Sequence, residues 1–402
     1  MDYTVTQKEA INTINQNLQI IACAGSGKTQ VISARIIQIL KENNNIHPSN
    51  IVAFTFTEKA AGELKDRIYT LAKTEFGETV GFAEMFVGTI HGYCLNLLQS
   101  PPVYKFLKYG VLSEIQQRLL IDRYSSKSGL TETPLLKGGT LKKNIDSKLY
   151  QQLLEILAEG DVDTDNIPLS VKTATQKYHE LREKEKYLDY TTIVSEAVRI
   201  VKENNDVRRN LSKQVKFLVV DEYQDVNPLQ EALIKEFSSL GSNICVVGDD
   251  DQTIYQWRGS DITNIMSFSK NYQAVKETPL VDNFRSSVGV VSAAQKVIDN
   301  NNPHRLQKKM VSAGSQEYER GDILALQFSN PEEEAEWLVS KVLNLKETAY
   351  KDKVDSIERG LTFGDFAVLL RSVKADASPI IREFEKLKIP YIVVGMNGLF
   401  DT

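Results

Sequence analysis

The stretch at residues 18–33, LQIIACAGSGKTQVIS, constrains the fold more than any other part of the chain. A short apolar run leads into small residues, Gly-Lys-Thr follows, and apolar residues then recur at helical spacing. The backbone N–H groups of such a turn wrap phosphate oxygens, a Lys neutralises their charge, and a hydroxyl ligates Mg²⁺. Lys28 and Thr29 fill the last two roles, and Ala22 replaces the first glycine of the usual pattern. The stretch predicts a strand, a phosphate-binding loop and a helix; the alternative is a helix N-terminus that merely carries Gly and Lys.

A second apolar run, FLVVDE at residues 217–222, ends in two acidic residues. A continuous apolar run of this length is typical of a buried parallel strand. Adjacent carboxylates at a strand end can take two different roles in hydrolysis: Asp221 would hold Mg²⁺ through water, and Glu222 would polarise the attacking water. The alternative is an acidic surface turn, and the four apolar residues that precede Asp221 argue against it.

A third run, NICVVGDDDQTIYQWRGSD at residues 243–261, predicts another buried strand with a polar exit. Gln252 follows three aspartates, and its amide can contact a terminal phosphate. Tyr255 and Trp257 lie two residues apart in a polar loop, which is a pattern for stacking on bases at about 1–3 kcal/mol each. The alternative is that both aromatic side chains fill a seam between domains.

Composition bounds the class of protein. The 402 residues suffice for about two or three domains, and 42% hydrophobic with 25% charged residues is ordinary for a globular chain. No apolar run reaches the ~20 residues of a membrane span, so no membrane partner is expected. Three scattered cysteines and the lack of a signal-peptide pattern favour a reducing, cytoplasmic location. The net charge of -5 leaves room for a locally basic groove that binds nucleic acid.

Taken together in chain order, the motifs resemble the UvrD/Rep/PcrA family of superfamily 1 DNA helicases. The segments that carry the resemblance are TQKEAI, ACAGSGKT, AFTFTEKAAGELKDRI, GTIHGYC, VVDEYQD, VGDDDQTIYQWRG, VDNFRSS, FAVLLRS and IPYIVVGMNGLFD. This set covers most of the chain and is far more specific than a lone phosphate-binding loop.

The resemblance implies a role for each matching position. Gln7 would bond the adenine edge, Phe284 would stack on adenine, and Arg285 would reach the γ-phosphate as an arginine finger. The implied catalytic residues are Lys28, Glu222, Gln252 and Arg285. The implied nucleotide-binding residues are Gln7, Ala24, Gly25, Ser26, Gly27, Lys28, Thr29, Gln30, Phe284 and Arg285. The implied Mg²⁺ site is Thr29 and Asp221, and the implied DNA path is Phe56, Thr57, Thr89, His91, Tyr255 and Trp257. A buried structural histidine is the alternative for His91.

Three departures from the family pattern stand out. Glu58 occupies a position that is usually Asn, where an acid is unfavourable near a phosphate backbone unless it points away. Gln30 replaces an Arg that often lies beside the adenine. The chain stops at GLFDT, before the inserted 2B domain and motifs V and VI of the family.

The expected fold class is α/β: a P-loop NTPase with RecA-like parallel sheets. Residues 1–91 and 213–280 would form the first RecA-like domain, with a helical insertion at residues 92–212. Residues 281–402 would form the front half of a second RecA-like domain. Within it, the pattern predicts helices at 286–300, 331–345 and 380–388, and strands at 322–328, 366–372 and 390–395.

These features lead to a functional hypothesis with two alternatives. The first is an ATP- and Mg²⁺-dependent helicase or translocase, moving 3′→5′ on single-stranded DNA and acting at single/double-strand junctions, as in DNA repair, or the amino-terminal part of such an enzyme. The second is an ATP-gated DNA-binding subunit that needs a protein partner, such as a nuclease, or a missing carboxy-terminal half. The third is an ATPase switch that does not bind DNA.

Overall fold

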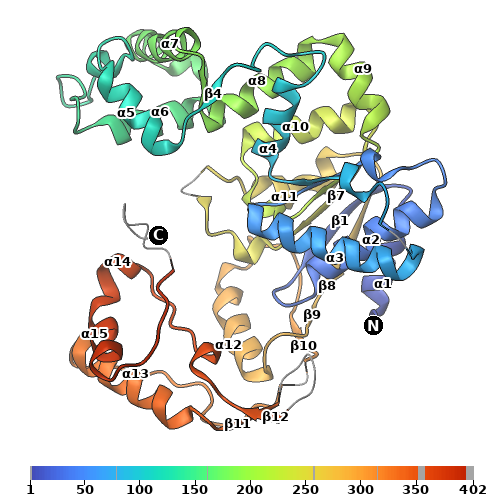
Figure 1. Ribbon diagram of the computed structural model, residues 1–402, viewed down its shortest axis with the longest axis vertical. Helices are drawn as coiled ribbons and strands as arrows, with labels where there is room; N and C mark the ends of the chain where they lie inside the picture. The colour runs from blue at the N-terminus through green and yellow to red at the C-terminus, as the bar shows by residue number, and fades with distance from the viewer. Residues whose placement is uncertain are drawn as a thin grey trace. The chain divides into compact units, whose positions relative to one another are not determined.

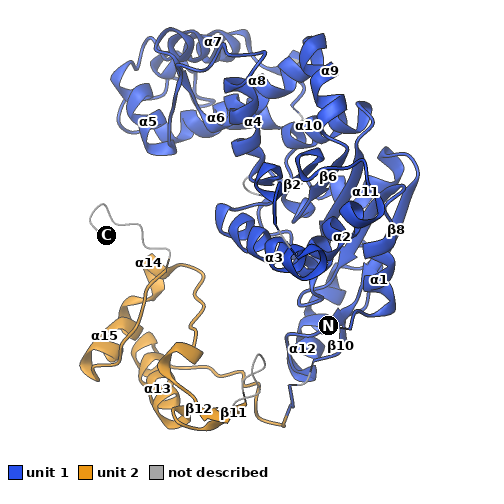
Figure 2. Cartoon of the chain, turned by 45° about the vertical axis from the view of Figure 1, so that its right-hand side comes forward, with its two compact units in different colours: residues 1–318 blue, residues 319–402 orange. Residues whose placement is uncertain are grey.

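A computed structural model describes residues 2–77, 79–160, 162–256, 259–314, 316–351 and 358–394. The chain forms two compact units, residues 1–318 and 319–402 (Figure 2). The predicted division between the two RecA-like domains lies earlier, at residue 280, and stays a prediction. Across the described residues, every helix is too short or too polar to span a lipid bilayer.

The first unit is built on a six-stranded sheet with the strand order β3-β2-β6-β7-β1-β8 (Figure 1). All neighbouring strands in it are parallel, which confirms the predicted α/β class. The strands are β1 Asn17–Ala22, β2 Ile51–Phe54, β3 Phe86–Gly88, β6 Phe217–Val220, β7 Asn243–Gly248 and β8 Val275–Leu280. The three strands predicted from apolar runs, β1, β6 and β7, are confirmed and lie side by side in the centre of the sheet.

Helices cover both faces of this sheet, because successive residues of each strand point to opposite sides. On one face, Ile51 and Ala53 of β2 pack with α1, α2 and α3. On the other face, Val52 and Phe54 pack with α4, α8, α10 and α11. The bounds are α1 Val5–Asn12, α2 Lys28–Glu42, α3 Glu58–Phe76, α4 Ile90–Gln99, α8 Tyr190–Glu203, α10 Pro228–Ser239 and α11 Thr263–Asn271.

The stretch predicted as a helical insertion consists of α4 and α8 together with α5 Glu114–Arg123, α6 Ser147–Glu159, α7 Leu169–Lys184 and α9 Asn205–Gln214. Its own core gathers Ile121, Leu130, Tyr150 and Tyr178. A short parallel pair, β4 Gly110–Val111 with β5 Tyr187–Leu188, also lies here and gave no signal in the sequence.

After β8, the first unit continues through β9 Asp282–Asn283, α12 Val288–Ile298 and β10 Val311–Ser312, and β9 and β10 pair in parallel. The second unit holds α13 Pro331–Leu345, α14 Val373–Asp376 and α15 Ser378–Lys386, plus the antiparallel pair β11 Ala349–Lys351 and β12 Glu358–Gly360. The helices predicted at 286–300, 331–345 and 380–388 are therefore confirmed.

The strand predictions at 322–328, 366–372 and 390–395 are wrong for the residues that the structure describes, of which residue 395 is not one. None of these segments forms a strand, and their apolar side chains are exposed, with Leu324 at 52%, Leu369 at 93% and Ile392 at 90%. A strand exists only when a neighbour supplies hydrogen-bond partners. Among the described residues of this unit, no neighbouring strand pairs with these segments.

Candidate nucleotide and nucleic-acid site

The phosphate-binding loop lies between the carboxyl end of β1 and the start of α2. Gly25 (φ 70°) and Gly27 (φ 82°) adopt the left-handed conformation that glycine reaches without strain. Gly27 is the N-cap of α2, so the free N–H groups of the first helical turn face the loop. The Ser26 hydroxyl is buried and has no hydrogen-bond partner among the described residues. The loop therefore offers unpaired donors around a positive helix end, as an anion requires.

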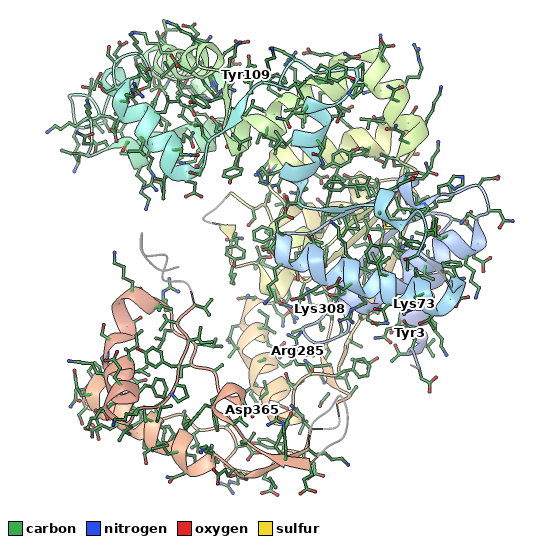
Figure 3. The ribbon with its side chains drawn as sticks, viewed as in Figure 1. Tyr3, Lys73, Tyr109, Arg285, Lys308 and Asp365 are labelled. Carbon is green, nitrogen blue, oxygen red and sulfur yellow. The ribbon has the colours of Figure 1, made fainter. Side chains whose placement is uncertain are left out.

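Residues 283–285 clamp this loop from outside. The Asn283 amide donates to Ala24 O at 2.8 Å, and Phe284 N donates to Gly25 O at 3.0 Å. A Cβ at Gly25 would lie 2.8 Å from the Cβ of Arg285. Phe284 and Arg285 are thus brought beside the loop, as the resemblance implies (Arg285 is labelled in Figure 3). Asn283 was not singled out from the sequence, and its only signal is its place before Phe284 in VDNFRSS.

Lys28 and Glu222 meet at the carboxyl ends of β1 and β6. Lys28 Nζ lies 2.8 Å from Glu222 Oε2. Burial opposes the charge of Glu222, but Lys28 and a hydrogen bond from the Gln224 amide outweigh it, so the pKa of Glu222 lies below its ordinary value. Glu222 also has φ 50°, a rare conformation for a residue other than glycine that is typical of functional sites. The sequence predicted both residues.

Asp221 precedes Glu222 and Thr29 follows Lys28 in the sequence. Burial and the nearby Glu222 carboxylate raise the pKa of Asp221 to about 6, while Lys28 opposes the shift. Within the part of the chain that the structure describes, its side chain accepts a hydrogen bond from Glu222 N at 3.0 Å. Thr29 is the second residue of α2. A carboxylate whose charged form is disfavoured by burial and a hydroxyl at the start of α2 are oxygen donors of the kind that suits a hard divalent cation.

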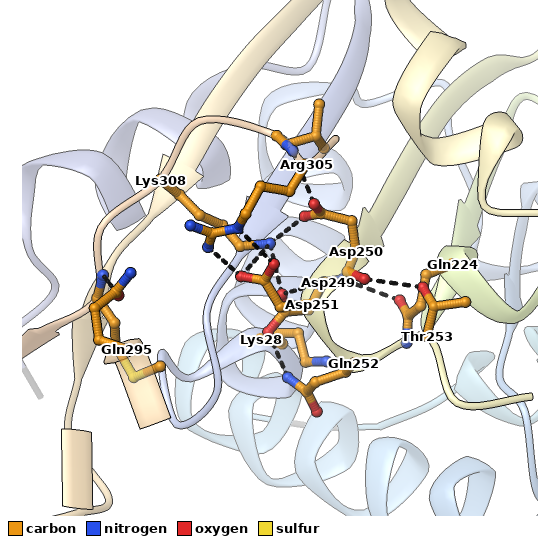
Figure 4. A network of polar contacts seen from close by, with 12 residues as sticks. Lys28, Gln224, Asp249, Asp250, Asp251, Gln252, Thr253, Gln295, Arg305 and Lys308 are labelled. Carbon is orange, nitrogen blue, oxygen red and sulfur yellow. Dashed lines mark hydrogen bonds and ion pairs between the residues drawn. The ribbon is translucent and has the colours of Figure 1, made fainter. Parts of the chain in front are cut away.

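Gln224 joins this centre to the segment after β7. Its amide donates to Glu222 Oε2 at 2.8 Å. Its Oε1 accepts from Asp249 N at 3.0 Å (Figure 4). Asp249 in turn accepts a hydrogen bond from the Gln252 amide. Three hydrogen bonds, through Asp249 and Gln224, therefore connect Gln252 to Glu222. Gln224 was not predicted from the sequence, although it stands two residues after Glu222 in the DEYQD motif.

The residues expected at the adenine end are engaged within the chain. Gln7 accepts from Thr4 N at 3.0 Å and donates to Ser26 O at 3.1 Å, which ties α1 to the phosphate-binding loop. The Gln30 amide donates to Tyr3 Oη at 2.8 Å and accepts from Arg67 Nη1 at 2.8 Å. Gln7 thus lies against the loop and Gln30 belongs to α2, while Phe284, whose backbone N–H donates to Gly25 O, is 39% exposed.

Two of the residues expected on the DNA path form a stacked pair. The rings of Phe56 and Tyr255 lie 5.3 Å apart with planes at 19°, and Phe56 is 40% exposed. Thr57, next to Phe56, is the N-cap of α3 and accepts from Ala60 N at 3.1 Å. Trp257 lies outside the described residues. An exposed aromatic stack from two different loops is a suitable platform for a base.

Thr89 and His91 lie at the start of α4. Thr89 is the N-cap and accepts from Gly92 N at 3.2 Å, and its hydroxyl donates to Glu58 Oε1 at 2.9 Å. His91 is half-buried, meets the Tyr190 ring edge-on at 5.7 Å between centroids, and has its pKa lowered by burial. The acid that departs from the family pattern therefore points at a residue expected to meet DNA.

Comparison with known proteins bears on this arrangement. The family model described as the UvrD/REP helicase N-terminal domain matches residues 3–273. The chain belongs to the UvrD/Rep helicase family. The model of the UvrD-like helicase C-terminal domain matches residues 278–402. The family predicted from the motifs is thus confirmed over nearly the whole chain.

Among individual relatives, the ATP-dependent DNA helicase PcrA of Staphylococcus aureus (strain NCTC 8325 / PS 47) is 29% identical over 409 residues. The same holds for PcrA of Staphylococcus epidermidis (strain ATCC 12228 / FDA PCI 1200). These alignments cover 98% of this chain and 51% of each relative, so the chain spans about half the length of these UvrD/Rep family members. The Pif1 helicase from Candida albicans aligns over 69% of this chain and 40% of its own, at 12% identity and a TM-score of 0.31.

Proposed function

We propose that the chain is the ATP-hydrolysing, single-stranded-DNA-binding engine of a helicase or translocase. The observation that carries the proposal is the contact between Lys28 and Glu222, which closes at 2.8 Å beside a phosphate-binding loop. Lysine, carboxylate and loop together are the parts that phosphoryl transfer to water requires. The names of the relatives, ATP-dependent DNA helicases, agree with this chemistry.

ATP would bind with its phosphates in the loop at residues 24–29. The Lys28 ammonium has three N–H donors, of which one contacts Glu222, so it can bridge the phosphates and the carboxylate. The lowered pKa of Glu222 keeps it ionised at neutral pH, and an ionised carboxylate can orient and polarise the attacking water. Arg285 enters beside Gly25 and would neutralise charge on the γ-phosphate.

Thr29 and Asp221 would hold Mg²⁺, which supplies charge neutralisation of the phosphates. Burial raises the pKa of the Asp221 carboxyl to about 6, so its charged form is disfavoured. A cation bound in place of the proton would stabilise that charged form. At the other end of the nucleotide, Gln7 and Phe284 would meet the adenine, with Gln30 beside them. Gln7 is already fixed to the loop through Ser26 O.

DNA would bind over the Phe56–Tyr255 stack, with Thr57, Thr89, His91 and Trp257 along the same path. Tyr255 stands three residues after Gln252, which would contact the γ-phosphate. If Gln252 moves when the bound nucleotide changes from ATP to ADP, the stack on which a base rests would therefore shift with it. Binding of this kind is sequence-tolerant and weakens with salt. The 3′→5′ direction and the use of single/double-strand junctions rest on the family resemblance alone.

The test is steady-state ATP hydrolysis by the purified chain, with and without oligo(dT), beside the variant Glu222→Gln. We expect hydrolysis that depends on Mg²⁺ and rises with DNA, and a fall of about 10²–10⁴-fold in Glu222→Gln with ATP affinity retained. Hydrolysis by the wild type that DNA does not change, with no binding of oligo(dT), would favour an ATPase switch instead.

A further inference from the structure

A buried cluster of charges lies behind the phosphate-binding loop, and none of the roles above uses it. Its acidic half is Asp249, Asp250 and Asp251, which follow β7. Its basic half is Arg305 and Lys308, from the connection between α12 and β10 (Figure 4). The acidic half ends at Asp251 and the basic half begins at Arg305, so the two halves are distant in the sequence.

Lys308 is the centre of this cluster. Its Nζ lies 2.6 Å from Asp249 Oδ1 and 3.4 Å from Asp251 Oδ2, and it also contacts Asp250. The side chains of Lys308, Asp249 and Asp250 are 0%, 3% and 1% exposed. Burial disfavours the charge of Lys308, but Asp249 and Asp250 outweigh it and raise its pKa, so it is an ammonium ion. The three carboxylates could in geometry hold a metal ion, but this ammonium already occupies the place between them.

The neighbouring residues fix the same connection to the same acids. Arg305 Nε donates to Asp251 Oδ1 at 2.8 Å, and Leu306 N donates to Asp250 Oδ2 at 2.8 Å. Residues 305–308 are thus held to all three acids at once. A purely structural ion pair would not need three consecutive carboxylates at the carboxyl end of a central strand, where the nucleotide is expected.

Asp249 connects the cluster to the hydrolytic centre. One of its oxygens meets Lys308, and the other accepts from the Gln252 amide. Its backbone N–H donates to Gln224, whose amide donates to Glu222. The Lys308 ammonium therefore holds the Asp249 carboxylate, which in turn holds the Gln252 amide. Through Gln224, Asp249 is also connected to Glu222, the carboxylate that contacts Lys28.

We propose that Lys308 is a positioning residue for ATP hydrolysis: by holding Asp249, it sets the place of the Gln252 amide and of Glu222, so that turnover requires the 305–308 connection to be docked on Asp249–Asp251. This inference rests on the proposed function. It adds a residue outside the motifs quoted for the family, on the connection that leads from α12 to the β9–β10 pair beside the loop.

The experiment separates positioning from charge balance. Lys308→Met removes the ammonium and leaves the acids uncompensated, so it can also destabilise the fold. The double variant Lys308→Met/Asp250→Asn removes one negative charge as well. The Asp250 carboxylate accepts from Leu306 N and Lys308, and among the described residues it makes no hydrogen bond to Gln252 or Gln224. Lys309→Met, an exposed neighbour with the same change of charge, is the control.

We expect the double variant to regain the thermal midpoint of the wild type while its kcat for ATP, with oligo(dT) present, stays at least about tenfold lower and its KM changes less than about threefold. Lys309→Met should match the wild type. A double variant with the kcat of the wild type would overturn the inference, because charge balance alone would then suffice.

A second readout needs no turnover. The ratio of affinities for ADP and a non-hydrolysable ATP analogue reports whether Gln252 distinguishes the terminal phosphate. We expect this ratio to move toward one in the double variant. If the wild type fails to hydrolyse ATP, the proposed function is wrong, but this affinity ratio still tests the role of Lys308. Equal ratios in the wild type and the double variant would overturn the positioning role.

Discussion

The Thr89 hydroxyl donates to Glu58 Oε1 at 2.9 Å, so a carboxylate lies against the first turn of α4. The N-terminus of a helix favours an anion, and here the anion belongs to the protein. A DNA phosphate that approaches Thr89 would meet this negative charge.

We therefore expect Glu58→Gln to bind oligo(dT) about 3- to 10-fold more tightly at low salt, with the gain shrinking as salt rises, because screening removes the repulsion. Fluorescence anisotropy of a labelled oligonucleotide measures it. Glu63→Gln is the matched control, since Glu63 lies on the same helix and pairs at 3.9 Å with Lys59, away from Thr89. Equal gains in both variants would mean that net charge alone is responsible.

The Phe56–Tyr255 stack should contribute to DNA affinity as a unit. We expect Phe56→Ala and Tyr255→Ala each to weaken oligo(dT) binding by about 1–3 kcal/mol, because each removes a surface on which a base can stack. The double variant should lose about 0.5–1.5 kcal/mol less than the sum, since the two rings also support each other. Tyr69→Ala, a 36% exposed aromatic on α3, should leave the affinity unchanged. Additive losses would show that the rings act separately.

Gly25 should tolerate no side chain. A Cβ there would lie 2.8 Å from Arg285 Cβ and 2.9 Å from Asn283 Nδ2, and the backbone has φ 70°. Gly25→Ala should lower the free energy of unfolding by about 1–3 kcal/mol through crowding, beyond its backbone strain, and weaken ATP binding. Gly77→Ala is the control, because Gly77 has φ 77° with nothing within 4 Å of its Cβ, so it reports the strain alone. Urea unfolding and nucleotide titration measure both effects, and equal stabilities of the two variants would contradict the clamp.

Glu155 should make the stability of the helical insertion depend on pH. Burial and the carboxylates of Glu159, Glu114 and Asp189 raise the pKa of Glu155 to about 7. Because this pKa exceeds that of an unfolded glutamate, about 4.3, the folded state holds the proton more tightly. The resulting stability is complete below about pH 4 and is lost as the pH rises through 7.

Glu155→Gln should remove this dependence and stabilise the protein by roughly 1 kcal/mol at pH 8, a value reduced for partial exposure to solvent. Urea unfolding at pH 5.5 and pH 8 is the measurement. A wild type that is equally stable at both pH values, or a variant that keeps the loss, would contradict the assignment.

The centre of the first unit could be predicted because local pattern and burial agree there. β1, β6 and β7 are apolar runs with two neighbours each, and functional residues follow directly at their carboxyl ends. β8, with the sequence VKETPL, alternates in burial and lies at the sheet edge, so it gives no apolar run. The strand order itself depends on pairings between distant residues, which no local window contains.

The sequence predicted those candidate site residues that belong to a recognisable local motif. The predicted residues Lys28, Glu222 and Asp221 could be picked out because each closely follows an apolar run that forms a strand. Gln224, Asn283 and Lys308 each contact a residue that is distant in the sequence, namely Asp249, Ala24 and Asp249 in turn. Lys308 stands in QKKM, where a run of charge is ordinarily solvated. In the second unit, the apolar runs at 322–328 and 366–372 predicted strands, but an apolar run states only that a segment needs a partner, not that one is present.

The place of β1 in the sheet has a consequence for synthesis on the ribosome. Among the described strands, β1 pairs with β7 and β8, whose partner residues, Cys245 and Val275 for example, are translated more than 200 residues later. At about 5–20 residues per second, the first strand waits on the order of ten seconds or more before a neighbour exists. The helices of the insertion make local contacts and can fold in that interval. The phosphate-binding loop, which β1 carries, therefore takes its final shape only after β7 and β8 have been made.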